Sequence, residues 1–133
     1  MRIGVPKEIK PQENRIGLTP DSVKTLVSEG HEVLVENNGG FEAGFDNDQY
    51  KNAGAKIIEK AADIFNDAEI IVKVKEPQKV EVEMIRENQI VYTYLHLAAA
   101  KELTEGLVKS KSINIAYETI TDDNGRLPLL APM

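Results

Sequence analysis

Three titratable side chains lie just beyond apolar runs that are typical of β-strands. Arg15 lies in the loop after the first of these runs, Lys75 ends a later one, and His96 ends a third. In a parallel α/β sheet, ligands bind outside the carboxyl ends of the strands, so we expect the three side chains to lie along one rim. A guanidinium, an ammonium and an imidazole together indicate a small anionic substrate that gains or loses a proton.

His96 and Arg15 each have a chemical use and a plainer interpretation. The ordinary pKa of histidine, about 6.5, suits proton exchange near neutrality, so His96 is a candidate general acid and base. Otherwise it is a histidine satisfied by backbone groups at a strand end. Arg15 presents a planar guanidinium that suits a substrate carboxylate, although most loop arginines are simply solvated. Its neighbour Glu13 would either hold it in place or screen its charge.

Lys75 follows Lys73 with a period of two, so both should lie on the same strand face as Ile71. As a site residue, Lys75 would meet a carboxylate or polarise a carbonyl oxygen. One alternative is a lysine that protects an edge strand from aggregation. Another is a side chain that buries its stem while its ammonium reaches water.

Two other patterns do not support a ligand site. The glycine-containing segment 37–44 does not match the dinucleotide fingerprint G-x-G-x-x-G, because position 41 is phenylalanine, and it lacks the lysine of a P-loop. It is interpreted as a flexible loop. No metal site is predicted, because a calcium loop needs a spacing that these acidic residues do not have: Asp46, Asp48, Asp122 and Asp123.

Composition indicates a small single-domain protein. The 133 residues predict one domain, 1–133, with a core that needs no disulfide or metal. The absence of cysteine excludes a disulfide framework and a zinc–thiolate site. A net charge of -6 with dispersed basic residues argues against nucleic acid as a partner. No apolar run approaches the roughly 20 residues of a membrane span, so we expect a soluble, cytoplasmic protein without membrane contact.

Short β-rich runs alternate with helical patterns. Thr19 is a strong N-cap with a proline after it, and Gly30 ends that helix. This alternation predicts an α/β fold: a doubly wound, mostly parallel sheet with helices on both faces. The Asn-Gly turn at 122–125 predicts a C-terminal hairpin that adds an antiparallel edge. The expected strands are 2–5, 31–36, 55–58, 69–75, 90–95 and 113–120, and the expected helices are 19–30, 46–54, 60–66, 80–86 and 98–109.

The last residues, from Leu127 to Met133, are apolar. Chain ends are more often polar and loosely held. This composition predicts that the polypeptide was divided at a domain boundary, or that the segment docks on another surface.

Four phrases of the sequence resemble the amino-terminal part of alanine dehydrogenase, and the resemblance extends over the whole chain. The opening phrase is similar in proton-translocating transhydrogenases, whereas the Lys-Val-Lys-Glu-Pro and Leu-His-Leu-Ala pair looks like the alanine enzyme. The phrases are Met1-Arg2-Ile3-Gly4-Val5-Pro6-Lys7-Glu8 with Asn14-Arg15; Val72-Lys73-Val74-Lys75-Glu76-Pro77; Tyr94-Leu95-His96-Leu97-Ala98-Ala99; and Ile115-Ala116-Tyr117-Glu118-Thr119 with Leu127-Pro128-Leu129-Leu130-Ala131-Pro132-Met133.

The resemblance implies a parent enzyme that reversibly oxidises L-alanine with NAD to pyruvate and ammonia. By the same resemblance, Arg15 matches the arginine that binds the substrate carboxylate, Lys75 the substrate-binding lysine, and His96 the catalytic acid and base. Met133 stands where the family's cofactor contacts begin, so it is a candidate cofactor residue.

The family's NAD-binding Rossmann domain and the carboxyl-terminal helices that complete its catalytic domain are absent from residues 1–133. The resemblance therefore implies that NAD is bound mainly by the missing domain, and that this segment alone is inactive. It also implies a homo-oligomer in the full-length protein.

Two other functions stay open at this point. A segment of a transhydrogenase soluble domain would support NAD binding without an alanine site, and the presence of Lys75 and His96 disfavours it. A non-enzymatic α/β module that binds a small carboxylate would use Arg15 and Lys75 and leave His96 as a structural residue.

Overall fold

The computed structural model describes all of residues 1–133. Its centre is a six-stranded sheet in the order β3-β2-β1-β4-β5-β6, with every pair of neighbours parallel. The predicted doubly wound α/β fold is confirmed. The strand order reverses between β1 and β4, which is the position where such sheets place a ligand crevice. The strands are β1 Arg2–Val5, β2 Glu32–Glu36, β3 Lys56–Ile58, β4 Ile70–Val72, β5 Ile90–Thr93 and β6 Ile113–Ala116.

Side-chain caps mark the starts of the first two helices. Thr19 accepts a hydrogen bond from the Ser22 backbone N–H and caps the first helix, and Asp46 forms a capping box with Gln49 at the second. The helices are α1 Pro20–Ser28, α2 Asn47–Asn52, α3 Ala61–Asp67, α4 Lys79–Val82 and α5 Lys101–Ser110, with 3-10 turns η1 Phe41–Ala43, η2 Leu97–Ala99 and η3 Tyr117–Thr119.

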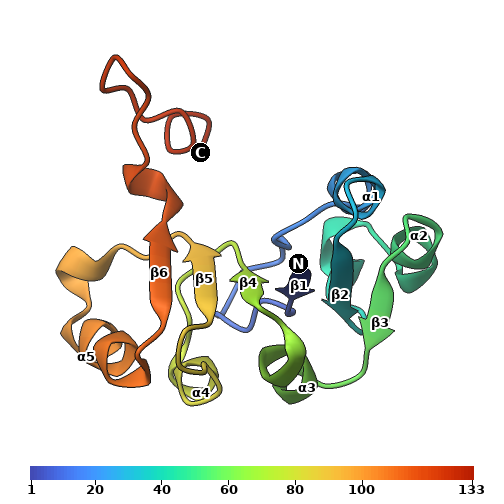
Figure 1. The fold of residues 1–133 in the computed structure, drawn as a ribbon, viewed down its shortest axis with the longest axis horizontal. Helices are drawn as coiled ribbons and strands as arrows, with labels where there is room; N and C mark the ends of the chain where they lie inside the picture. The colour runs from blue at the N-terminus through green and yellow to red at the C-terminus, as the bar shows by residue number, and fades with distance from the viewer.

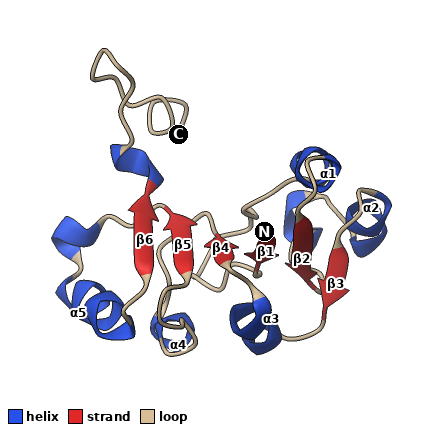
Figure 2. Cartoon of the chain, viewed as in Figure 1, coloured by secondary structure: helices blue, strands red, loops and turns tan.

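Two apolar cores lie on opposite faces of the sheet, so helices do cover both faces (Figure 1). Helices α1 and α2 pack over β1, β2 and β3, while α3, α4 and α5 cover the other face (Figure 2). The first core consists of Ile3, Val5, Ile16, Val23, Val33, Val35, Tyr50 and Ala55. The second consists of Leu34, Ile64, Phe65, Ala68, Ile71, Ile85, Val91, Leu95 and Leu107.

The β5–β6 part of the α1/α2 face has no helix over it. Ile113 and Ile115 pair in register with Ile90 and Tyr92, so these four side chains share one face. Ile113 is 51% exposed and Ile115 is 37% exposed. Helix coverage is therefore complete on one face and partial on the other.

The predicted antiparallel edge is wrong. Residues 122–126 do form a tight turn, in which the Asp122 backbone N–H donates to the Arg126 carbonyl and Gly125 adopts a φ of 75°. No strand follows it, because the chain after η3 runs away from the sheet (Figure 1). With no neighbouring strand to pair with, the turn residues have no ladder to join.

Three predicted strands also end early. The fourth ends at Val72 rather than at residue 75, the fifth at Thr93 rather than at residue 95, and the sixth at Ala116 rather than at residue 120. The Lys73 N–H still bonds to the Tyr92 carbonyl of β5, but the N–H groups of Val74, Lys75 and Leu95 bond to carboxylate side chains, and residues 117–119 form a 3-10 turn.

Candidate functional site

Lys75 and His96 both lie against the ring of Tyr94. The Lys75 ammonium lies 5.1 Å from the centre of that ring, a distance at which a cation is attracted to the ring face. The His96 imidazole stacks on the same ring, with 5.8 Å between ring centres and 19° between planes. Its Nδ1 lies 3.4 Å from the Tyr94 hydroxyl oxygen. These residues come from the loops at the carboxyl ends of β4 and β5, as predicted.

The three side chains line one cavity of about 350 Å³, a size that suits a small ligand. Lys10 also lines it and forms an ion pair of 2.5 Å with Glu76, from the loop after β4. Two ammonium groups, an imidazole and the Glu76 carboxylate therefore surround a space at the rim of the sheet. Glu76 neutralises Lys10, whereas Lys75 has no ion-pair partner, so the space suits a small anion beside Lys75.

His96 has an uncommon backbone conformation. Its φ of 47° and ψ of 48° lie in the left-handed region, which costs a residue with a Cβ about 1–2 kcal/mol. The side chain is exposed, while the backbone N–H is held at 2.9 Å from the Glu118 Oε2 atom. His96 is therefore a positioned group rather than a histidine buried against backbone carbonyls.

Lys75 lies in a loop that is fixed on three sides. Glu8 accepts hydrogen bonds from the backbone N–H groups of Val74 and Lys75, at 3.1 and 3.0 Å. The Thr93 hydroxyl donates to the Lys75 carbonyl and the Tyr117 hydroxyl donates to the Val74 carbonyl. Strand β4 lies between β1 and β5, so the interpretation of Lys75 as a marker of an edge strand is wrong.

Lys73, which precedes this loop, is buried between two carboxylates and does not line the cavity. Its ammonium lies 3.1 Å from Glu8 and 3.1 Å from Glu81, and all three side chains are 2% exposed or less. Burial raises the pKa of Glu81, and the nearby Lys73 opposes that rise. The buried cluster of Glu8, Lys73 and Glu81 thus ties the β1 and β4 loops to helix α4.

Arg15 is held by its neighbour Glu13. The guanidinium makes a bidentate contact through Nε and Nη2, at 3.0 and 2.7 Å, which resolves the two predicted roles of Glu13 in favour of holding. The Arg15 hydrogen bond lowers the pKa of Glu13 to about 2, with a smaller contribution from the charge of Lys75. The Arg15 side chain remains 57% exposed and available to a ligand.

The predicted site residues are brought together to different extents. Lys75 and His96 line the same cavity, and Arg15 lies outside the cavity wall with its partner Glu13 within the electrostatic reach of Lys75. Met133 is 54% exposed in the C-terminal turn, where its N–H donates to Leu130, and it does not line the cavity.

Three residues that complete the site were missed in the sequence. Tyr94 was visible only as part of an apolar strand, and Glu8 as a charged residue in a loop. Glu118 lies two residues beyond β6, so the same strand-end reasoning would have found it. Because the predicted sixth strand, 113–120, included Glu118, this residue was not recognised as lying beyond a strand end.

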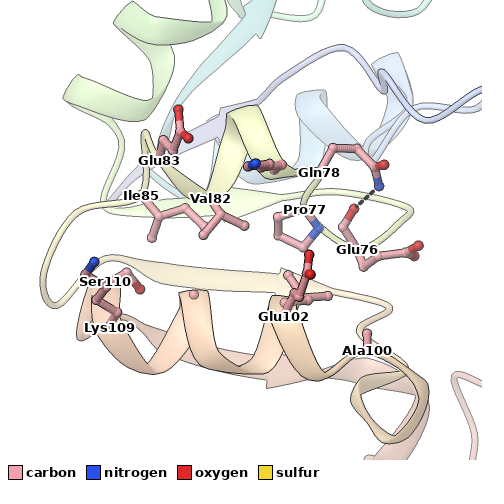
Figure 3. Close-up of a pocket in the computed structure, with 13 residues that line it drawn as sticks. Glu76, Pro77, Gln78, Val82, Glu83, Ile85, Ala100, Glu102, Lys109 and Ser110 are labelled. Carbon is pink, nitrogen blue, oxygen red and sulfur yellow. Dashed lines mark hydrogen bonds between the residues drawn. The ribbon is translucent and has the colours of Figure 1, made fainter.

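A larger cavity, of about 620 Å³, lies between helices α4 and α5 (Figure 3). Its walls include the apolar side chains Val82 and Ile85 and the carboxylates Glu83 and Glu102. It contains none of the three predicted residues. We take the smaller cavity as the candidate site, because it gathers the groups that can bind an anion and move a proton.

Comparison with known proteins identifies the relatives of this fold. Residues 4–133 match the family model described as "Alanine dehydrogenase/PNT, N-terminal domain". The chain belongs to this family. The alanine dehydrogenase of Staphylococcus epidermidis is 50% identical over 133 residues, which are 100% of this chain and 36% of the relative. The chain therefore spans little more than a third of the length of that relative.

Solved structures agree with this family. An L-alanine dehydrogenase superimposes with a TM-score of 0.96 at 51% identity, covering 99% of this chain and 36% of that one. A transhydrogenase from Sinorhizobium meliloti superimposes with a TM-score of 0.84 at 28% identity, covering 90% of this chain and 36% of that one. Within the family, the alanine dehydrogenases are thus the more similar relatives.

None of the helices combines the length and the apolar composition that a membrane-spanning segment requires.

The strand order of this family member matches that of dinucleotide-binding sheets, but its switch point does not fit a dinucleotide. Such sites have a glycine-rich turn after the first strand, where a pyrophosphate meets backbone N–H groups. Here the loop after β1 instead supplies Glu8, which with Glu81 encloses Lys73. This loop has no glycine between Val5 and Gly17, so it offers no such turn to a pyrophosphate. No group of three or more histidine, aspartate or glutamate side chains could hold a metal ion.

Proposed function

We propose that this chain is the amino-terminal part of the catalytic domain of an NAD-dependent L-alanine dehydrogenase, which interconverts L-alanine with pyruvate and ammonia. The observation that carries the proposal is that Lys75 and His96 both lie against Tyr94 and line one cavity with it. The 50% identity with an alanine dehydrogenase over the full chain supports the substrate class. NAD is expected to be held mainly by a second domain, since the switch point here does not fit it.

Arg15 and Lys75 are proposed to bind the substrate carboxylate. Glu13 fixes the Arg15 guanidinium through Nε and Nη2, which leaves the N–H groups of Nη1 and the second N–H of Nη2 to donate to a planar carboxylate. Lys75 is held by its backbone and leaves its ammonium over the Tyr94 ring. Fixing the carboxylate at two points orients the Cα atom for reaction.

His96 is proposed to be the general acid and base. As water adds to the carbon of the imine formed from alanine, an imidazole in this position accepts a proton from it, and it returns a proton as ammonia leaves. Its place beside Tyr94, in the wall of the cavity that Lys75 also lines, supports this role. Met133 is proposed as a contact of the cofactor when the remaining polypeptide is present.

The site assignment is tested in the full-length enzyme by alanine-dependent NADH formation. His96→Ala should lower kcat by about a hundredfold or more. In the reverse reaction, followed as NADH oxidation with pyruvate and ammonia, Arg15→Ala should mainly raise the KM for pyruvate. Arg15→Lys keeps the charge without the bidentate geometry, so it should give an intermediate KM. Glu42→Ala, a change at an exposed carboxylate on η1, is the control.

Three results would contradict these assignments. A near-normal kcat in His96→Ala would exclude the acid–base role, and an unchanged KM in Arg15→Ala would exclude carboxylate binding. The absence of alanine-dependent NADH formation by the full-length protein would favour a non-enzymatic carboxylate-binding module. Assembly as a cytoplasmic homo-oligomer is part of the proposal, and sedimentation of the full-length protein tests the oligomer.

A further inference from the structure

Glu118 is a buried carboxylate that has no cationic partner. It is 9% exposed, and none of the ion pairs of the chain includes it. Its oxygens accept hydrogen bonds from the backbone N–H groups of Leu95, at 3.1 and 3.0 Å, and of His96, at 2.9 Å. A buried carboxylate is unfavourable unless such donors stabilise it. Its two donors are the candidate acid–base residue and the residue before it.

The backbone of His96 needs such a contact. A left-handed conformation at a residue with a Cβ persists only where the surroundings over-determine it, and His96 has a φ of 47°. Its side chain contributes little support, because its only polar neighbour is the Tyr94 hydroxyl at 3.4 Å. The charge-assisted hydrogen bond from the His96 N–H to Glu118 is the shortest polar contact of this residue.

The same arrangement occurs one strand away, at Lys75. Glu8, from the loop after β1, accepts hydrogen bonds from Val74 and Lys75, as Glu118, from η3 after β6, does from Leu95 and His96. Each candidate side chain is thus oriented through a pair of peptide N–H groups that meet a carboxylate from a neighbouring strand. Glu8 also pairs with the buried Lys73, whereas Glu118 has no second duty of this kind, so its effect can be tested separately.

We propose that Glu118 is a positioning residue for His96: its carboxylate fixes the left-handed turn that places the imidazole at the wall of the cavity. The inference rests on the proposed acid–base role of His96. A misplacement of about 1 Å can lower a rate by about a hundredfold. Loss of the carboxylate should therefore lower kcat by roughly 10- to 100-fold and leave the KM for alanine nearly unchanged.

The test is a double-mutant cycle in the full-length enzyme, with kcat for NADH formation as the readout. Glu118→Ala is measured alone and in the His96→Ala background. In the second background the lost carboxylate has no imidazole to orient, so kcat should fall by less than about twofold. Glu118→Gln should retain more activity than Glu118→Ala. One carboxylate oxygen, Oε2, accepts hydrogen bonds from the N–H groups of both Leu95 and His96, and the amide oxygen of glutamine can take its place. Glu42→Ala is the surface control.

The cycle separates failure of this inference from failure of the proposed function. Wild-type kcat in His96→Ala would overturn both, because there would be no acid–base role to support. A large loss in His96→Ala with wild-type kcat in Glu118→Ala would overturn only the role of Glu118. An equal loss from Glu118→Ala in both backgrounds would also overturn it, since that pattern is general structural damage. If Glu118→Ala does not fold, Glu118→Asp, which keeps the charge but shortens the reach, takes its place in the cycle.

Discussion

Replacing Lys73 by methionine should destabilise the fold strongly. The ammonium is 1% exposed and lies 3.1 Å from each of two carboxylates that are equally buried. Methionine has nearly the same volume, so the packing is kept while Glu8 and Glu81 lose their counter-ion. Removing one partner of a buried ion pair costs about 3–5 kcal/mol. With a urea m-value of about 2 kcal/mol/M, the unfolding midpoint should fall by roughly 2 M at pH 7.

The pH dependence gives a second check on Lys73→Met. Burial raises the pKa of Glu81, so its protonated form is favoured in the folded chain, and its contribution to stability is lost as pH rises through that raised pKa. Without Lys73 the pKa of this carboxyl should rise further. The stability difference between the variant and the parent should therefore shrink as pH falls from about 7 toward about 5.

Urea unfolding followed by circular dichroism, at both pH values, measures these differences. Lys24→Met makes the same substitution at an exposed lysine of α1 and should shift the midpoint little. A Lys73→Met midpoint within the error of this control at pH 7 would refute the view that the ammonium compensates two buried carboxylates. A difference that grows in acid would refute the titration reasoning.

Three further predictions concern single positions. Glu13 should stay ionised in acid, since its hydrogen bond from Arg15 lowers its pKa from 4.5 to about 2; the associated stability is present above 4.5 and lost as pH falls toward 2. A carboxyl NMR titration of the parent and of Arg15→Met checks this, and a parent midpoint near 4.5 would contradict it. Gly4→Ala would place a Cβ 2.5 Å from the Ile64 Cγ2 atom and should lower the free energy of unfolding, measured with urea, by about 1–3 kcal/mol. An unchanged free energy would mean that helix α3 can move away from β1. His96→Gly should maintain the free energy of unfolding or raise it by up to about 1 kcal/mol, because glycine tolerates the left-handed backbone. The same change should abolish NADH formation by the full-length enzyme. A clear loss of stability would show that the stacking of the imidazole on Tyr94 contributes more than the relief of backbone strain.

The positions of Lys75 and His96 could be predicted because they depend on local pattern. Each follows an apolar run, and a parallel sheet brings the carboxyl ends of its strands to one rim. Their orientation could not be predicted in this way. The carboxylates that hold their loops come from residues up to 67 positions away in the chain, as in the bond from the Lys75 N–H to Glu8, and the Tyr94 ring that Lys75 lies over comes from the next strand.

Strand ends were the weakest part of the prediction, and the reason is also non-local. Whatever its apolar pattern, a run of residues stays a strand only as far as a neighbouring strand offers backbone groups to pair with. Residues 73–75 continue the alternation of β4, yet only the Lys73 N–H bonds to β5, at the Tyr92 carbonyl. The N–H groups of Val74 and Lys75 bond to the Glu8 carboxylate instead. Pairing with neighbouring strands also decided the end of β6. Glu118 therefore lies in a 3-10 turn rather than in a strand, and the turn at 122–125 has no partner strand.

By itself, then, the sequence determined the alternation of strands and helices, the helix caps, and the identity of the three groups able to bind an anion and exchange a proton. These properties follow from side-chain period and type, which act over a few residues. Tertiary structure alone decided which lysine is buried and which faces the cavity, since the fold places Glu8 and Glu81 around the Lys73 ammonium and the Tyr94 ring under the Lys75 ammonium. It also decided the left-handed turn of His96, because Glu118 reaches that turn from another strand end.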